Sequence, residues 1–182
     1  MKKITSLIVS VVLASSLFAD DAYFGVSYGA ASTSKTVYGN ASDTDETPVY
    51  YGYDNVSLTG ISFSAFSSFN DDTFLIGIGA DGYFNKGDFI KGGTLESNLK
   101  IGGAYNDFKG YALLGYGIQS LSSYTVAVGV LYGVGARYDI FKHLSASIEY
   151  RKHQLETTEN DDATAHQKYE LSGVYFSADY RF

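Results

Sequence analysis

The stretch Gly173-Val-Tyr-Phe-Ser-Ala-Asp-Tyr-Arg-Phe182 decides the fold of this sequence. Every second residue counted back from Phe182 is apolar, whereas the residues between them include Asp179 and Arg181. Successive side chains of a β-strand point to opposite faces of the sheet. The alternation therefore predicts a strand with one apolar face and one polar face.

The same alternation recurs in seven earlier segments. In the longest, residues 125–139, the even-numbered residues are apolar and the odd-numbered ones are mostly small or charged. The remaining apolar faces fall at residues 24–30, 61–65, 74–80, 95–105, 112–118 and 144–150. None of the eight faces carries a charge. The segments run about 9 to 15 residues, which suits tilted strands that cross a bilayer.

A soluble β-sandwich also alternates, but a charge-free face on all eight segments favours a barrel in a membrane. Hydrocarbon offers the backbone no hydrogen-bond partners, so a sheet that crosses it has to close on itself. We therefore predict an all-β fold, an eight-stranded antiparallel up-and-down transmembrane β-barrel. An even number of strands brings both ends of the barrel to one side of the membrane.

The connections between the predicted strands should alternate as well. We expect long or medium loops at residues 31–55, 85–93, 120–124 and 154–168, and short turns at 66–73, 106–110 and 140–143. In outer-membrane barrels, the short turns face the periplasm and the longer loops face outside. The turn signals Asn70-Asp-Asp72 and Asn106-Asp107 fall on the short side.

The chain begins with a pattern typical of exported proteins. Lys2 and Lys3 precede an apolar stretch at residues 4–18, and Ala19 stands before Asp20. We predict a signal peptide at residues 1–19 and a barrel domain at residues 20–182. A transmembrane helix is the alternative, but this stretch is shorter than the roughly 20 apolar residues that span a bilayer.

Charge and composition narrow the range of functions. The chain has 13 basic and 20 acidic residues, so loss of Lys2 and Lys3 leaves 11 against 20 and a net charge of −9. Nucleic acid is excluded as a partner, because phosphate binding needs a basic surface. The sequence has no cysteine, which excludes disulfides and thiolate metal sites. We expect neither a cofactor nor a metal site.

The closing strand, with Phe176, Tyr180 and Phe182, resembles the C-terminal signature of bacterial outer-membrane barrels, which the barrel-assembly machinery reads. Residues 135–151 resemble the sixth strand, turn and seventh strand of the small OmpA- and OmpX-like barrels. The resemblance implies the outer membrane of a Gram-negative bacterium, with outer-membrane lipid and lipopolysaccharide as neighbours. Members of this class anchor, adhere, protect the surface or modify lipid A, so the resemblance implies no single mechanism. We expect no peptidoglycan-anchoring domain after the barrel.

Charged residues on the predicted inner face should fill the barrel. They are Asp81, Glu96, Lys100, Arg137, Asp139, Glu149, Arg151, Asp179 and Arg181. An unpaired charge there would cost several kcal/mol, so we predict a hydrogen-bonded ion network. Eight strands leave an interior that side chains fill, and inward glycines beside Tyr23, Tyr83, Tyr111 and Tyr175 suit such packing. The alternative is a gated ion path through a rearranging network, as in a narrow channel or porin-like protein.

An enzyme would need a nucleophile and a base held together. The most plausible triad combines His153 with Ser122 or Ser123 and Glu156, but no sequence spacing supports it. We therefore expect no catalytic activity, and we place His153 at the barrel rim. A lipid A-modifying enzyme remains a second alternative to the surface role described next.

Specific function should reside in the outer loops, because the barrel is a scaffold. The loop at residues 31–55 carries Tyr38, Tyr50, Tyr51 and Tyr53, and aromatic side chains in a polar loop suit contact with protein or glycan. Acidic loop residues could share divalent cations with lipopolysaccharide phosphates. We interpret the chain as a structural or surface-interaction protein, with adhesion to a host or environmental ligand as one such role.

Overall fold

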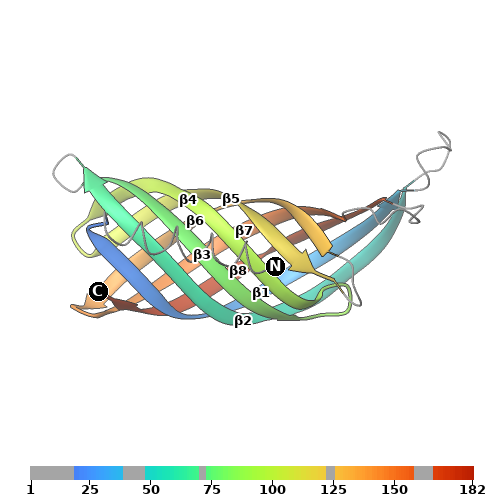
Figure 1. Ribbon diagram of the computed structural model, residues 1–182, viewed down its shortest axis with the longest axis horizontal. Coiled ribbons are helices and arrows are strands. Elements are labelled where there is room, and N and C mark those ends of the chain that lie inside the picture. The colour runs from blue at the N-terminus through green and yellow to red at the C-terminus, as the bar shows by residue number, and fades with distance from the viewer. Residues whose placement is uncertain (1–18, 39–47, 70–72, 122–125, 158–165) are drawn as a thin grey trace, which may run out of the picture.

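The computed structural model describes residues 19–38, 48–69, 73–121, 126–157 and 166–182. These residues form eight β-strands in chain order (Figure 1). The strands are β1 (Asp21–Tyr38), β2 (Val49–Phe69), β3 (Phe74–Lys86), β4 (Lys91–Tyr105), β5 (Phe108–Ser120), β6 (Val126–Phe141), β7 (Leu144–Thr157) and β8 (His166–Arg181). The predicted signal peptide lies outside the described residues apart from Ala19.

Each strand pairs antiparallel with the next along the chain, and β8 pairs with β1, so the sheet is a closed barrel. The seam is in continuous register from Tyr23 opposite Arg181 to Tyr38 opposite His166. Beyond that register, the Phe182 amide donates to the Ala22 carbonyl oxygen at 3.0 Å. The predicted eight-stranded antiparallel barrel is confirmed. Among the described residues, no helix is long and apolar enough to cross a membrane.

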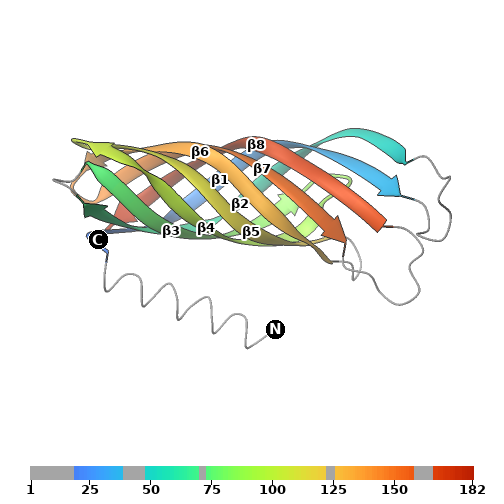
Figure 2. The same cartoon turned by 90° about the horizontal axis from the view of Figure 1, so that it is seen from above.

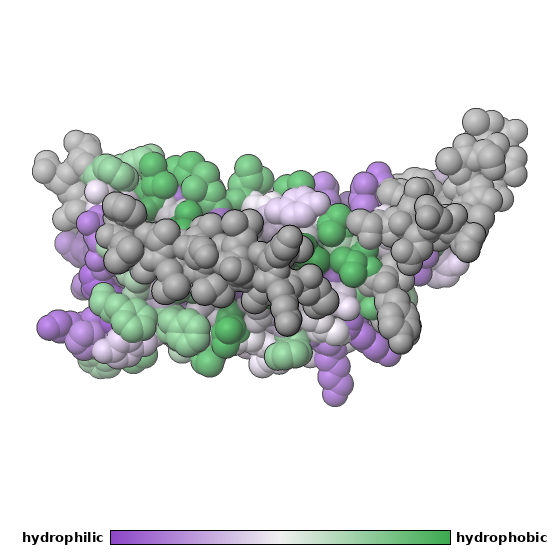
Figure 3. All heavy atoms as spheres, in the orientation of Figure 1, coloured by the Kyte–Doolittle hydropathy of each residue, from purple (hydrophilic) through white to green (hydrophobic). Residues whose placement is uncertain are grey.

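The outer face of the barrel carries an apolar band. Side chains such as Val26, Leu114 and Val134 point outward and are 60–65% exposed. Figure 3 shows apolar side chains along much of the uncovered part of the visible face and hydrophilic ones gathered toward the two ends. The predicted parity is confirmed, and the outer face is suited to hydrocarbon.

The strands join at two different ends. At what we call the turn end, β2, β4 and β6 end and β3, β5 and β7 begin, and the turns at residues 106–107 and 142–143 lie there. At the opposite end, which we call the loop end, β1, β3, β5 and β7 end and β2, β4, β6 and β8 begin. Exposed rings surround the turn end on the outer face: Phe74, Tyr105, Tyr138, Tyr180 and Phe182. Aromatic rings favour the boundary between lipid and water, so this belt places the turn end at a membrane interface.

Several strands are longer than the sequence pattern predicts. The predicted loop at residues 31–55 is wrong, because β1 continues to Tyr38 and β2, 21 residues long, begins at Val49. The predicted loop at residues 154–168 is also too long, because β7 continues to Thr157 and β8 begins at His166. On β8 the outer face turns polar at Ser172, and on β1 at Ser32, yet the backbone pairing continues past both. Hydrogen bonds between strands do not need an apolar face, so the sheet extends beyond the band.

The extension forms what we call the projecting sheet: residues 32–38 of β1, 49–57 of β2 and 166–172 of β8. Its strands reach beyond the end of β3, which pairs with β2 only as far as Ser57 opposite Lys86. Figures 1 and 2 show β1 and β2 rising past the rest of the barrel at the loop end. The projecting sheet therefore carries the barrel beyond the membrane surface.

Candidate functional site: the barrel interior and the projecting sheet

The alternation of each strand directs polar side chains into the barrel. The structure places all nine of the predicted inward charges on the inner face, and eight of them are buried. The exception is Arg181 at the turn end, whose side chain is 31% exposed. These charges separate into three groups along the barrel axis, and each group has its own partners.

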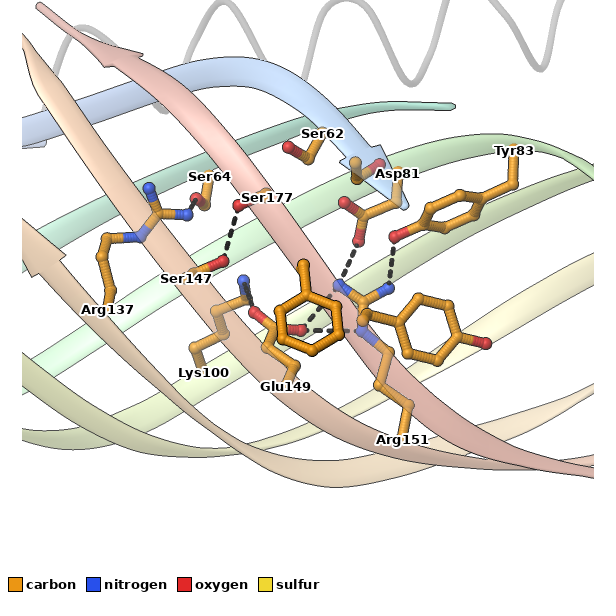
Figure 4. A pocket seen from close by; sticks show the side chains of 13 residues that line it. Ser62, Ser64, Asp81, Tyr83, Lys100, Arg137, Ser147, Glu149, Arg151 and Ser177 are labelled. Atoms are coloured by element: carbon orange, nitrogen blue, oxygen red, sulfur yellow. Dashed lines mark hydrogen bonds and ion pairs between the residues drawn. The ribbon is translucent and has the colours of Figure 1, made fainter. Parts of the chain in front are cut away.

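The first group is the central ion cluster, made of Asp81, Glu96, Lys100, Glu149 and Arg151. Arg151 lies at its centre, with Nη1 2.7 Å from Glu96 Oε2. Its Nη2 lies 2.9 Å from Asp81 Oδ2 and 2.6 Å from Glu149 Oε2 (Figure 4). Lys100 Nζ contacts Glu149 Oε1 at 2.8 Å. One guanidinium thus holds three carboxylates, which its planar set of donors permits.

Neutral side chains complete the central ion cluster. Arg151 Nη1 donates to the Tyr83 hydroxyl at 3.0 Å, and the Tyr111 hydroxyl donates to Glu149 Oε1 at 2.6 Å. A cavity of about 10 Å³ remains beside them, with five serines in its lining. That volume is close to one water molecule. Side chains therefore fill this part of the interior and leave little free volume.

His153 belongs to the interior and not to the rim. Its side chain is 1% exposed, with Nδ1 3.5 Å from Glu96 Oε1 and Nε2 3.3 Å from the Tyr175 hydroxyl. The prediction that His153 lies at the barrel rim is therefore wrong, because alternate residues of β7 point into the barrel as far as Leu155. Glu156 points to the opposite face of β7, so the two do not form a catalytic pair. Ser122 and Ser123 lie outside the described residues.

The second group is a salt bridge between Arg137 and Asp179 nearer the turn end, with Nη1 2.7 Å from Oδ2. Ser64 and Ser145 accept further hydrogen bonds from the guanidinium. The guanidinium carbon also lies 4.1 Å from the centroid of the Tyr23 ring. Together these contacts surround the fully buried Arg137 with polar and aromatic partners.

The third group closes the turn end. Lys109 Nζ lies 2.7 Å from Asp139 Oδ2 and 3.2 Å from Asp21 Oδ2. Arg181 contacts the same two carboxylates at 3.2 and 2.6 Å. The sequence pattern does not identify Asp21 and Lys109 as inward charges, because Asp21 precedes the predicted strand and Lys109 falls in the predicted turn at residues 106–110. Extending the parity of Tyr23 and Tyr111 by two residues finds both.

Two apolar clusters occupy the remaining interior. One joins Tyr23, Phe66, Leu75, Tyr111, Leu113 and Leu131 near the turn end. The other lies toward the loop end and joins Ala31, Val56, Leu58, Tyr83, Ile90, Leu121, Ala127, Leu155, Tyr169, Leu171 and Tyr175. Glycines face the largest rings: a Cβ on Gly29 would lie 2.9 Å from the Tyr175 ring. The interior is therefore filled by charged and apolar side chains packed together.

The tyrosines predicted in a loop lie on the projecting sheet instead. Tyr50, Tyr51 and Tyr53 belong to β2, and Tyr38 is the last residue of β1. Tyr50 and Tyr53 are on the outer face, with ring centroids 6.1 Å apart in an edge-to-face arrangement. Tyr51 faces the other way, because the pairing of β1 with β2 shifts by one residue at Gly52. The tyrosines are thus held on paired strands rather than on an irregular loop.

The predicted assembly signal lies on the outer face of β8. Phe176, Tyr180 and Phe182 are all exposed there, and the Tyr180 and Phe182 rings meet edge to face at 5.0 Å. His143, in the turn between β6 and β7, stacks on Tyr180 with the ring centroids 5.3 Å apart. These rings are in position to contact lipid or another protein at the turn end.

Comparison with known proteins gives the fold a context. No family model and no curated protein matches the sequence. Among solved structures, Ail of Yersinia pestis, an attachment invasion locus protein, is 15% identical over 88% of this chain and 98% of that chain, with a TM-score of 0.39. The outer-membrane protease OmpT of Escherichia coli is 9% identical over 90% and 97% of the two chains, with a TM-score of 0.41.

The outer-membrane protein AlkL, solved in lipid bilayers, is 14% identical over 89% of this chain and 90% of that chain, with a TM-score of 0.49. At these identities the likeness concerns the fold. The closed antiparallel sheet, its apolar outer band and its ion-paired interior are the features on which the assignment rests. The chain has the fold of a small eight-stranded transmembrane β-barrel.

Proposed function

We propose that this protein is a structural and surface-interaction protein whose projecting sheet contacts ligands outside the cell, adhesion being one such role. The observation that carries the proposal is the exposure of Tyr50 and Tyr53 on the outer face of that sheet, at 55% and 79%. Tyrosine offers a large contact area at a low cost in side-chain entropy, and it is enriched in binding surfaces.

The length of β2 supports this role. A bilayer needs about 9–11 residues of a tilted strand, and β2 has 21. The excess of roughly ten residues, at about 3.3 Å each, corresponds to about 30 Å of additional strand. A barrel that served only to fill the membrane would gain nothing from this extension, whereas a protein that presents a surface would.

The filled interior argues against a channel. A conducting path would have to cross the apolar cluster at the loop end and also separate Arg151 from its three carboxylates. Eight-stranded barrels enclose side chains rather than an aqueous pore. A non-enzymatic role is part of the proposal, since His153 is buried among Tyr175 and Glu96 and is inaccessible to a lipid substrate.

We assign a partner to each surface of the barrel from the place where that surface lies. Outer-membrane lipid and lipopolysaccharide surround the apolar band and the polar edge above it. The barrel-assembly machinery would engage the exposed rings of β8. The external ligand, a protein or a glycan of a host or of the surroundings, would meet the projecting sheet.

The test is a binding assay with bacteria that express the barrel. Cells are scored on an epithelial monolayer and on a mucin-coated surface, against a strain that lacks the protein. The double variant Tyr50→Ser/Tyr53→Ser should reduce binding about tenfold, the effect of losing a central tyrosine contact. The matched control is Tyr105→Ser, an equally exposed ring at the turn end. Equal binding by parent and double variant, or none by the parent, would contradict the proposal.

A further inference from the structure

Three side chains form a row across the inner face of the projecting sheet. Lys35 of β1 lies directly opposite Tyr51 of β2 on one side and Tyr169 of β8 on the other. Its ammonium nitrogen is 5.6 Å from the centroid of the Tyr51 ring and 5.7 Å from that of Tyr169. We call these residues the Tyr–Lys–Tyr row.

A β-bulge creates this row. On β2, residues Val56 and Leu58 point inward, so simple alternation would point Tyr51 outward. The register moves from Ser34 opposite Tyr53 to Lys35 opposite Tyr51, which leaves Gly52 as the extra residue. Bulges commonly redirect a side chain beside a functional site. Here the bulge turns Tyr51 onto the same face as Lys35.

The positive charge of Lys35 is not matched by a carboxylate among the described residues. Lys152 and Lys168 at the same end are paired, with Glu170 and Glu156 at 3.1 Å each. Lys35 forms no ion pair within the part of the chain that the structure describes, although the whole chain has a net charge of −7.

The residues next along the inner face are also informative. Asp54 accepts hydrogen bonds from the backbone amides of Asp88 and Phe89 at 2.6 and 3.1 Å, so this carboxylate is already engaged. The hydroxyl of Thr33, opposite Asp54 and fully buried, has no hydrogen-bond partner among the described residues. A buried hydroxyl without a partner is uncommon. The inner face thus combines an unpaired cation with an unsatisfied hydroxyl.

We propose that the Tyr–Lys–Tyr row binds an acidic sugar, with its carboxylate on Lys35 and its ring against Tyr51, whose side chain is 47% exposed. Tyr169, which is buried, supports Lys35 from the other side and does not contact the sugar. The Tyr169 hydroxyl donates to Gln167 Oε1 at 2.7 Å, which leaves the amide NH₂ of Gln167 to donate to a sugar hydroxyl.

This inference rests on the proposed function and specifies a ligand class for the same projecting sheet. It uses the inner face, whereas the binding test above uses Tyr50 and Tyr53 on the outer face. The Tyr51 ring selects a flat apolar ligand surface and the Lys35 ammonium selects an anion, so neither a neutral sugar nor a flexible acidic peptide satisfies both.

The experiment uses the full barrel refolded in detergent micelles and isothermal titration calorimetry. The probes are tri-galacturonic acid, maltotriose as the neutral sugar and triglutamate as the acidic peptide. We expect tri-galacturonic acid to bind at least tenfold more tightly than either of the other two. Lys35→Gln and Tyr51→Ala should each weaken that binding at least tenfold. Lys152→Gln, which removes the same charge from the outer face at the same end, should leave it unchanged.

Retention of the heat-dependent shift in gel mobility shows that each variant is folded. Absence of tri-galacturonic acid binding, full binding by Lys35→Gln, or equal binding of maltotriose or triglutamate would overturn the inference. If cell binding depends on Tyr50 and Tyr53 while no acidic sugar binds, the inference alone fails. If acidic sugar binds through Lys35 but the cells do not adhere, the adhesive role fails and the site stands.

Discussion

Replacing Arg151 by alanine should destabilise the barrel by about 3–5 kcal/mol, the cost of breaking a buried ion pair. The guanidinium contacts Asp81, Glu96 and Glu149 at 2.6–2.9 Å. Its loss leaves those three carboxylates with Lys100 as the remaining cation of the cluster, which lies against Glu149. The exposed pair of Lys152 with Glu170 provides the comparison, because Lys152→Ala should cost about 0–1 kcal/mol.

Part of the stability that is lost with Arg151 should be recovered without restoring the arginine. Adding Asp81→Asn and Glu96→Gln to Arg151→Leu removes two of the unmatched charges and fills the space of the side chain. The triple variant should therefore be more stable than Arg151→Leu alone, an interaction that a mutant cycle isolates. Urea unfolding in lipid vesicles, read from the gel mobility of folded and unfolded forms, measures each free energy. Equal losses below about 1 kcal/mol for Arg151→Ala and Lys152→Ala would refute the reasoning.

Three further outcomes follow from the packing, the outer face and the filled interior. Gly77→Ala should lower the free energy of unfolding by about 1–3 kcal/mol in the same assay, because the new Cβ would lie 2.5 Å from the Phe66 ring. Gly52→Ala is the control, because its Cβ would meet nothing within 4 Å and the free energy of unfolding should change little. Val134→Arg should cost about 2–4 kcal/mol in lipid and Gln154→Arg, beyond the apolar band, about 0–1 kcal/mol. The purified barrel in a planar bilayer should show no discrete conductance steps, and reproducible steps would contradict a filled interior.

The sequence predicts the parity of the strands well, because alternation is a local property of each segment. The strand ends are predicted less well. Ser32, Ser34 and Thr36 give no hydrophobic signal, so the sequence pattern predicts a loop where β1 in fact continues. The backbone of β1 remains paired with β2 there. For the same reason, the sequence pattern assigns Lys109 to a turn and His153 to the barrel rim.

The partners of the inward charges could not be predicted, because they depend on contacts far apart in the chain. Arg151 meets Glu96 across the barrel interior, 55 positions away. No local pattern specifies which inward carboxylate faces which inward cation. The orientation of Tyr51 depends on a bulge at Gly52 that only the pairing of β1 with β2 shows.

The outer face of the barrel should lie in lipid as far as Ser172, where the outer face of β8 becomes polar. The sequence has no cysteine, so single cysteines on β8 can carry a spin label without a background. Labels at Ser172, Val174, Phe176 and Ala178, in the protein reconstituted in bilayers, report access to oxygen in lipid and to a nickel chelate in water. We expect high oxygen access at 174, 176 and 178 and a change to nickel access at 172. Water access at Phe176 and Ala178 would contradict a transmembrane barrel.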